Sequence, residues 1–104
     1  MNDKKFSITK EVANGCIRLT MKGRINSVNV DELQFMLEEV IEGEETSIVL
    51  NMFLVEYLNS SGIRVILKAF KDAKKAGRRL GIEKPSQNVR NVLGMVVLDE
   101  LLVK

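Results

Sequence analysis

The tripeptide Ser60-Ser61-Gly62 contains the side chains of this sequence that are best placed for chemistry. It follows a short apolar run over residues 47–50 and a further apolar connection, and it precedes a long stretch with helical periodicity. The pattern places Ser60 at a helix start, where free backbone N–H groups and the positive end of the helix dipole favour an added anion. A hydroxyl group held there is suited to reversible phosphorylation.

Ser60 also has a simpler interpretation, as the N-cap of that helix. Serine is a preferred N-cap residue because its hydroxyl oxygen accepts a hydrogen bond from a free N–H group of the first turn. Taken alone, a Ser-Ser-Gly sequence before an apolar helix favours this structural role over a regulatory one.

The remaining residue types argue against an enzyme. The chain has no histidine, which removes Ser-His-Asp and Cys-His nucleophile systems and most catalytic zinc sites. It also has no glycine-rich phosphate loop of the Walker or dinucleotide type. We therefore expect a protein that acts by binding, with no catalytic residues, no cofactor and no metal.

Length and charge narrow the class further. The 104 residues, 45% of them hydrophobic, predict a single domain over residues 1–104. The net charge of +2 is too small to indicate nucleic acid. The single cysteine is typical of a reducing compartment, and no apolar run approaches the roughly 20 residues of a membrane span. We expect a cytoplasmic protein without nucleic-acid or membrane partners.

Periodicity predicts the elements that position the tripeptide. Asn14-Gly15 is typical of a type I′ hairpin turn, and residues 17–22 alternate as a half-buried strand. A loop over residues 23–27 should lead to a helix with a capping box formed by Asn29 and Glu32. Residues 47–50 read as a short buried strand.

The second half of the chain continues the alternation of strands and helices. A helix is expected from Ser60 to about residue 76, with Ile63, Ile66 and Phe70 in the core. A strand at residues 80–82, a short helix opened by Pro85-Ser86 and ending near residue 93, and a closing segment over residues 98–103 complete the order. This order predicts an α/β fold with a mixed four- to five-stranded sheet, parallel at its centre, and helices mainly on one face.

Parallel strands place their C-terminal ends at one edge of a sheet, where α/β proteins usually bind ligands. Three strand-to-helix junctions should meet there, at residues 23–28, 52–60 and 84–86. The candidate partner-binding residues are Asn26, Ser27, Phe53, Leu54, Asn59, Ser60, Ser61, Gly62 and Ser86. Phe53 and Leu54 either pack beneath their connection or form an apolar contact for a partner, including a second copy in a homodimer.

The segment from Val49 to Gly62 resembles the signature of the STAS domain, V-L-D-L-S-x-V-x-F-I-D-S-S-G, the fold of bacterial anti-sigma factor antagonists. Asn51 and Asn59 replace the two aspartates of that pattern. Weaker matches extend the resemblance from about residue 5 to the C-terminus: Gly23, Lys74-Lys75-Ala76-Gly77, Pro85-Ser86 and Leu98-Asp99.

The resemblance implies a partner switch. It places the family's phosphorylated serine at Ser60 and implies binding to an anti-sigma factor that is also a serine kinase, with a serine phosphatase as a further partner. Asn59 lacks a carboxylate that would orient the hydroxyl group, and it also lacks that carboxylate's repulsion of a phosphate. The alternative is a STAS scaffold that is never phosphorylated, as an accessory subunit of a signalling or transport complex.

Overall fold

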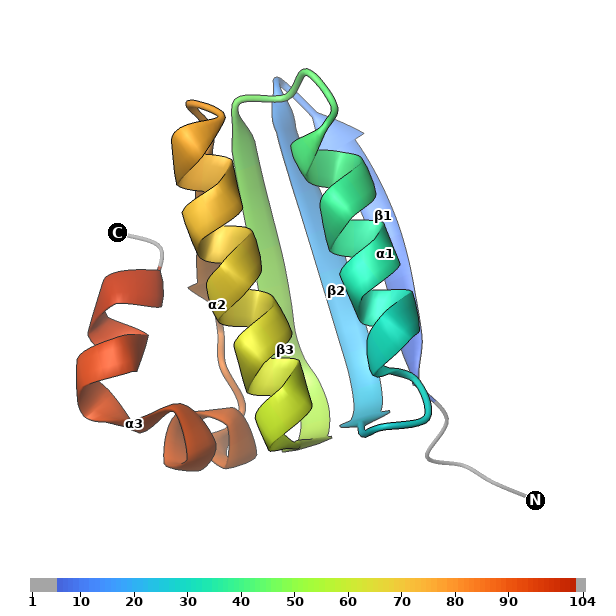
Figure 1. Ribbon diagram of the computed structural model, residues 1–104, viewed down its shortest axis with the longest axis vertical. Helices are drawn as coiled ribbons and strands as arrows, with labels where there is room; N and C mark the ends of the chain where they lie inside the picture. The colour runs from blue at the N-terminus through green and yellow to red at the C-terminus, as the bar shows by residue number, and fades with distance from the viewer. Residues whose placement is uncertain (1–5, 103–104) are drawn as a thin grey trace.

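The sheet has four strands in the order β1-β2-β3-β4, with helices α1 and α2 side by side on one face (Figure 1). This computed structural model describes residues 6–102. The elements are β1 (Ser7–Ala13), β2 (Cys16–Ile25), α1 (Val30–Ile41), β3 (Ser47–Leu58), α2 (Ser60–Lys75), β4 (Arg79–Glu83) and α3 (Gln87–Leu101). Strand β1 is antiparallel to β2, while the β2–β3 and β3–β4 pairs are parallel. The predicted α/β fold class is confirmed.

The turn between β1 and β2 is the predicted hairpin. Asn14 and Gly15 have φ angles of 53° and 76°, the left-handed conformations that a type I′ turn requires at both central positions. Ala13 pairs with Cys16 across the turn. The turn fixes the register and therefore decides which side chains of β2 face the helices.

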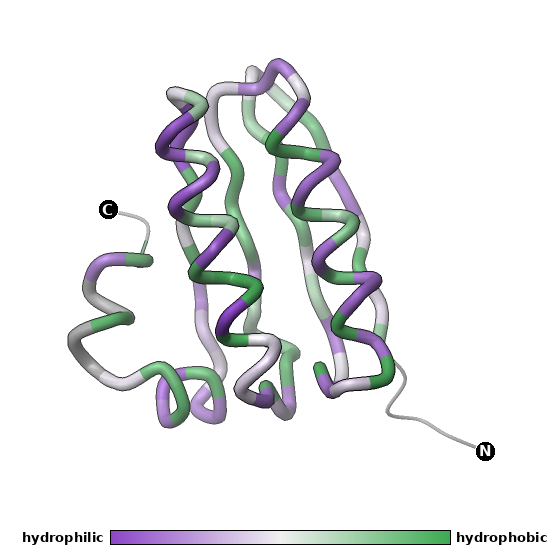
Figure 2. The backbone as a smooth tube through the Cα atoms, viewed as in Figure 1, coloured by the Kyte–Doolittle hydropathy of each residue, from purple (hydrophilic) through white to green (hydrophobic). Residues whose placement is uncertain are grey.

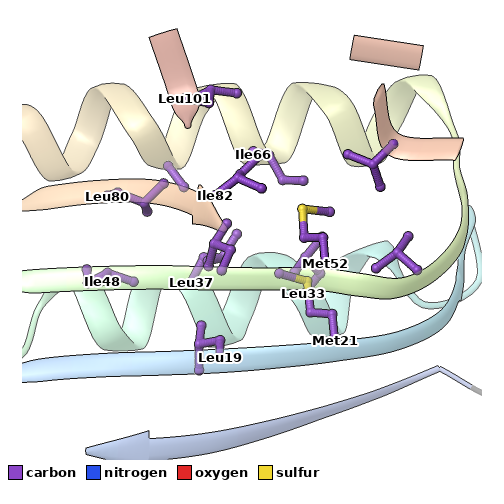
Figure 3. Packing of buried hydrophobic residues seen from close by; sticks show 14 of the residues in the cluster. Leu19, Met21, Leu33, Leu37, Ile48, Met52, Ile66, Leu80, Ile82 and Leu101 are labelled. Carbon is purple, nitrogen blue, oxygen red and sulfur yellow. The ribbon is translucent and has the colours of Figure 1, made fainter. Parts of the chain in front are cut away.

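The core lies between the sheet and the helices (Figure 3). Along β2 alternate residues are buried, while Arg18, Lys22 and Arg24 are exposed on the opposite face of the sheet. Hydrophilic and hydrophobic positions also recur along α1 and α2, at the spacing of a helix (Figure 2). The fully buried side chains include Leu19, Met21, Leu33, Leu37, Ile48, Leu50, Met52, Ile66 and Ile82.

Two expected core residues of α2 occupy the margin of this core. Ile66 is fully buried, but Ile63 and Phe70 are only partly buried and pack against the cluster from its edge. The positions closest to the sheet are instead filled by Ala69 and Ala73. Small side chains there bring the helix axis near the strands, which leaves the larger Phe70 beside the contact rather than within it.

Two strands extend beyond their expected ends. β2 continues to Ile25, where a loop over residues 23–27 was expected, and β3 continues to Leu58, where an apolar connection was expected. The β2–β3 register shifts between Thr20 and Lys22 and again between Gly23 and Arg24. Such irregularities add residues to one strand and interrupt its alternation of buried and exposed side chains, so the sequence pattern loses its strand signature there.

The prediction of a capping box between Asn29 and Glu32 is wrong, because Asn29 makes no side-chain capping bond to α1. A similar reciprocal pair lies three residues earlier, between Asn26 and Asn29. The Asn26 side-chain oxygen accepts from the backbone N–H of Asn29 (3.3 Å), and the Asn29 side-chain oxygen accepts from the backbone N–H of Asn26 (3.0 Å). This reciprocal pair has the geometry of a capping box with asparagine in both positions. The Asn29 amide also donates to the carbonyl oxygen of Arg24 (2.8 Å), which ties the loop to the end of β2.

Helix α3 contains a break at Gly94, whose φ and ψ are 76° and 164°. The predicted short helix ending near residue 93 is therefore the first half of α3, with Pro85-Ser86 before it as expected. The predicted closing segment over residues 98–103 is mostly the second half of α3, and residue 103 lies outside the described residues. Leu102 adds a parallel bridge to Ile82 of β4.

Arg78 joins the α1–β3 loop to the α2–β4 loop, at the end of the molecule opposite the C-terminal ends of the parallel strands. Its guanidinium group donates to the carbonyl oxygens of Glu45 (3.0 Å) and Ile41, the last residue of α1. We expect Arg78→Met to lower the free energy of unfolding by about 1.5–3 kcal/mol, because two partly buried acceptors lose a charged donor. Arg79→Met is the matched control, with an expected change within about 0.5 kcal/mol. Equal losses in denaturant titrations of the two variants would contradict this role.

Candidate functional site

The junctions β2–α1, β3–α2 and β4–α3 lie along one edge of the molecule, the lower edge in Figure 1. The backbone N–H of Asn59 donates to the carbonyl oxygen of Ile25 (3.1 Å), which joins the first junction to the second. The backbone N–H of Ser86 donates to the carbonyl oxygen of Met52 (3.1 Å), which joins the third junction to β3. The predicted convergence of the junctions is confirmed.

Asn59, and not Ser60, is the N-cap of α2. Its side-chain oxygen accepts from the backbone N–H of Gly62 (2.8 Å), and its backbone is extended, with φ and ψ of −83° and 177°. The expectation that Ser60 caps the helix is therefore wrong. An amide oxygen makes the same capping bond as the carboxylate of the STAS signature, so the Asn59 replacement leaves the helix start intact.

Ser60 is the first residue of α2, and its side chain is exposed. Since Asn59 performs the capping, the Ser60 hydroxyl group makes no hydrogen bond within residues 6–102. Its backbone N–H belongs to the first turn, where no intrahelical acceptor exists. A nucleophilic oxygen is thus presented to solvent at the positive end of a 16-residue helix.

Gly62 allows this helix start to approach the sheet. A Cβ atom at this position would lie 2.6 Å from Cδ1 of Leu58 and 2.9 Å from Cγ2 of Ile25. Both neighbours are buried. The glycine of the Ser-Ser-Gly sequence is therefore required by the close contact between the first turn of α2 and the ends of β2 and β3.

The β2–α1 loop lies next to the α2 start and contains two of the predicted residues. Asn26 is half-buried and holds the loop together, since its side-chain oxygen also accepts from the backbone N–H of Val28 (2.9 Å). Ser27 is exposed. Val28 is 89% exposed, and it was not among the predicted residues because a single valine in a loop carries no periodic signal. Val28 exposes an apolar side chain at the same edge as Ser60.

Ser61 faces a groove between α1 and α2 with a volume of about 360 Å³. The lining residues are Val30, Asp31, Gln34, Ser61, Arg64, Val65 and Lys68. Lys68 donates to Asp72 (2.7 Å), and this hydrogen bond lowers the pKa of the Asp72 carboxyl group.

Phe53 and Leu54 lie away from Ser60, on the face of the sheet opposite α1 and α2. They are 63% and 47% exposed, so the expectation that they pack beneath a connection is wrong. Leu54 pairs with Lys22 in the neighbouring strand, and Tyr57 further along β3 lies under the Arg24 guanidinium group, 4.7 Å from the ring centre. These residues form an apolar surface separate from the edge.

Ser86, one of the predicted site residues, has a structural role, because its hydroxyl group is hydrogen-bonded within the fold. Its hydroxyl group donates to the carbonyl oxygen of Val55 (2.6 Å) and accepts from the backbone N–H of Val89 (3.2 Å). It caps α3 and fixes that helix to β3. The structure thus brings Asn26, Ser27, Asn59, Ser60, Ser61 and Gly62 together, places Ser86 under the same edge, and separates Phe53 and Leu54 from it.

Two further observations concern residues 6–102 alone. Among the side chains that the structure describes in this range, which leaves out those of residues 95, 96, 98 and 99, no group of three or more from histidine, cysteine, aspartate and glutamate is arranged to hold a metal ion. None of the helices in this range has both the length and the apolar character to span a membrane.

A parallel-centred sheet, helices on one face and an exposed serine at the start of α2 together define a STAS domain. The STAS domain family model matches residues 7–103. The chain belongs to the STAS domain family, and the resemblance found in the sequence is confirmed.

Individual relatives agree with this assignment. BtrV of Bordetella bronchiseptica, which carries the name of an anti-sigma factor antagonist, is 26% identical over 87 residues, covering 84% of this chain and 75% of BtrV. An anti-sigma factor antagonist from Mycobacterium paratuberculosis has a similar structure, with a TM-score of 0.83 and 18% identity over 97% of this chain and 86% of the other. The phosphorylated form of SpoIIAA, a Bacillus cell fate determinant, has a TM-score of 0.75 and 19% identity, over 95% of this chain and 89% of SpoIIAA.

Proposed function

We propose that this protein is an anti-sigma factor antagonist that binds an anti-sigma factor and is released from it by phosphorylation of Ser60. The observation that carries the proposal is the position of the Ser60 hydroxyl group, exposed and without a hydrogen bond at the first residue of a helix that Asn59 caps. A regulatory hydroxyl group must be reachable by a kinase and must not be needed for the fold. Ser60 meets both conditions.

A phosphate at Ser60 has two opposite effects. Within the domain it is tolerated, because the helix dipole and the free N–H groups of the first turn favour an anion there. In a contact with a partner it adds about two negative charges that must lose water or meet a cation. Modification therefore disfavours the complex without unfolding the domain.

The partner in this proposal is an anti-sigma factor that is also a serine kinase, and a serine phosphatase resets the switch. The contact surface comprises the α2 start, the exposed loop residues Ser27 and Val28, and the groove beside Ser61. The protein acts by binding and not by catalysis, in the cytoplasm. The names of BtrV and the Mycobacterium protein, and the existence of a phosphorylated form of SpoIIAA, support this assignment.

Phosphate mapping in the native host tests the proposal. Tagged protein is recovered with its partners and analysed by mass spectrometry, beside Ser60→Ala and Ser61→Ala variants. We expect phosphate on Ser60 in the native protein and in Ser61→Ala, none in Ser60→Ala, and a kinase-like ATP-binding protein among the partners of all three. Phosphate on Ser61, or on neither serine under any growth condition, would refute the switch and favour the unphosphorylated scaffold.

A further inference from the structure

Charge is divided between two parts of this sequence. From residue 25 to residue 63 there is no lysine or arginine, although this segment contains eight of the chain's 14 acidic residues. Basic residues then dominate from Arg64 to Arg79, where Asp72 is the only acidic residue. The first segment includes α1, and the second includes all of α2 beyond its first turn. The division in the sequence therefore becomes a division between two neighbouring helices.

The two helices direct these charges outward from the sheet. The exposed acidic residues of α1 and its C-cap are Asp31, Glu32, Glu38, Glu39 and Glu42. The exposed basic residues of α2 are Arg64, Lys68, Lys71, Lys74 and Lys75. Because α1 and α2 lie side by side on the same face of the sheet (Figure 1), the helical surface has one acidic half and one basic half.

The stability of each helix explains only part of this arrangement. Asp31 and Glu32 in the first turn of α1, and Lys74 and Lys75 in the last turn of α2, complement the helix dipoles. The last turn of α1 has no basic residue, and Glu39 and Glu42 lie where the negative end of the helix dipole disfavours them. Glu38 with Glu42, and Lys71 with Lys75, are like-charged pairs at a spacing of four residues, which destabilise a helix. The fold therefore maintains charges that weaken the elements carrying them.

Ion pairs inside the described part of the chain do not neutralise these charges either. Within residues 6–102 none of the five acidic residues on α1 lies at ion-pair distance from a cation, and of the five α2 cations only Lys68 is paired, with Asp72 of its own helix. Glu38 of α1 acts through its charge on Lys68 of α2 and contributes to the raised pKa of that lysine. The remaining charges of each half have no ion-pair partner within the described chain.

We propose that the α1–α2 surface binds the same surface of a second copy of this chain, with each acidic helix over the basic helix of the other copy. A two-fold axis running along the groove between the helices produces this arrangement, because it exchanges the two halves of the surface. Both helices begin at the edge that carries Ser60 and run in the same direction (Figure 1). The axis therefore places Asp31 and Glu32 near Arg64 of the second copy, and Glu39 and Glu42 near its Lys71 and Lys75.

Phe35 lies at the centre of the acidic half and is 67% exposed. In the paired arrangement its ring meets the lysine side chains of the opposite α2. Lysine offers a hydrocarbon stem for apolar contact and an ammonium group for cation–π attraction. The exposed aromatic residue thus has a complementary neighbour in the second copy.

The size of the surface sets the strength of this contact. Helices of 12 and 16 residues are about 18 and 24 Å long. Each helix is about 10 Å wide, so the two together offer a contact surface of roughly 400–500 Å² per chain. Stable interfaces bury about 800 Å² per partner. The dimer is therefore weak, dependent on protein concentration and sensitive to salt.

Sedimentation of the purified chain, without any kinase, tests this contact independently of the proposed switch. At low ionic strength we expect reversible dimers that appear between about 10 μM and 1 mM and that dissociate in about 0.5 M salt. Glu39→Lys with Glu42→Lys should weaken self-association at least tenfold, as should Lys71→Glu with Lys75→Glu. An equimolar mixture of the two double variants should form a heterodimer, because both contacts then pair opposite charges.

Glu11→Lys and Lys22→Glu are matched controls, since both residues are exposed on β1 and β2, and neither change should alter association. A native chain that stays monomeric at about 1 mM in low salt would overturn the proposal. Dimers whose stability is unchanged by salt and by both double variants would also overturn it. The same holds if the double variants keep native circular dichroism but form no heterodimer with each other.

Discussion

Replacing Gly62 with valine is expected to destabilise the domain by about 3 kcal/mol or more. The cause is steric, since the first added atom already lies 2.6 Å from the Leu58 side chain and 2.9 Å from that of Ile25. Both neighbours are buried, so neither side chain can retreat without displacing the core around it. Gly62→Ala should cost about 1–3 kcal/mol for the same reason, and denaturant titration monitored by circular dichroism measures both values.

The sign of the Gly62→Ala effect distinguishes crowding from helix propensity. At an open helical position, exchange of glycine for alanine stabilises by roughly 0.5–1 kcal/mol. Ser61→Ala is the control within the same turn, with an expected change within about 0.5 kcal/mol. A Gly62→Ala variant as stable as the native chain would show that the first turn of α2 does not contact the strands as described.

Replacing Ser60 with aspartate is expected to weaken binding to the anti-sigma factor at least tenfold, about 1.4 kcal/mol. The added carboxylate enters the contact at the α2 start, where a charge without a counter-charge must lose its water. The same carboxylate lies at the positive end of the helix dipole, so thermal unfolding should show no loss of stability. Titration calorimetry with the partner recovered from the host measures the affinity.

Ser60→Asn separates charge from shape, because asparagine has the size of aspartate without its charge. It should retain an affinity within about threefold of the native protein, since the expected penalty is electrostatic. Equal weakening by asparagine and aspartate would mean that any larger side chain blocks the contact, and the phosphorylation switch would then lose its electrostatic basis.

The parts of this fold that sequence predicted are those with local signals. Asn14-Gly15 specified its turn through two left-handed residues, and alternation along residues 17–22 gave the direction of each β2 side chain. Ser60-Ser61-Gly62 located the helix start to within one residue. Each of these signals depends only on residues that are neighbours in the sequence, so the amino-acid sequence alone is enough to find them.

The missed features depend on contacts between distant segments. The strand character of residues 51–58 was hidden because irregular pairing with β2 places consecutive residues such as Phe53 and Leu54 both in solvent. The choice of Asn59 over Ser60 as the cap follows from the bond between the Asn59 N–H and Ile25, which fixes where the helix begins. The marginal position of Phe70 follows from the alanines that draw α2 toward the sheet.

The face of the sheet opposite α1 and α2 has a consequence for how this sequence can diverge. Along β2 only alternate positions, such as Leu19 and Met21, are constrained by the core, while Arg18 and Lys22 on either side of them are exposed. Half of the strand can therefore accumulate substitutions with little effect on stability, so long as the alternation survives. What must persist in this strand is the alternation of apolar and polar positions and not the identity of each residue. Distant descendants of one ancestral domain can therefore share this architecture after most of their residues have been substituted.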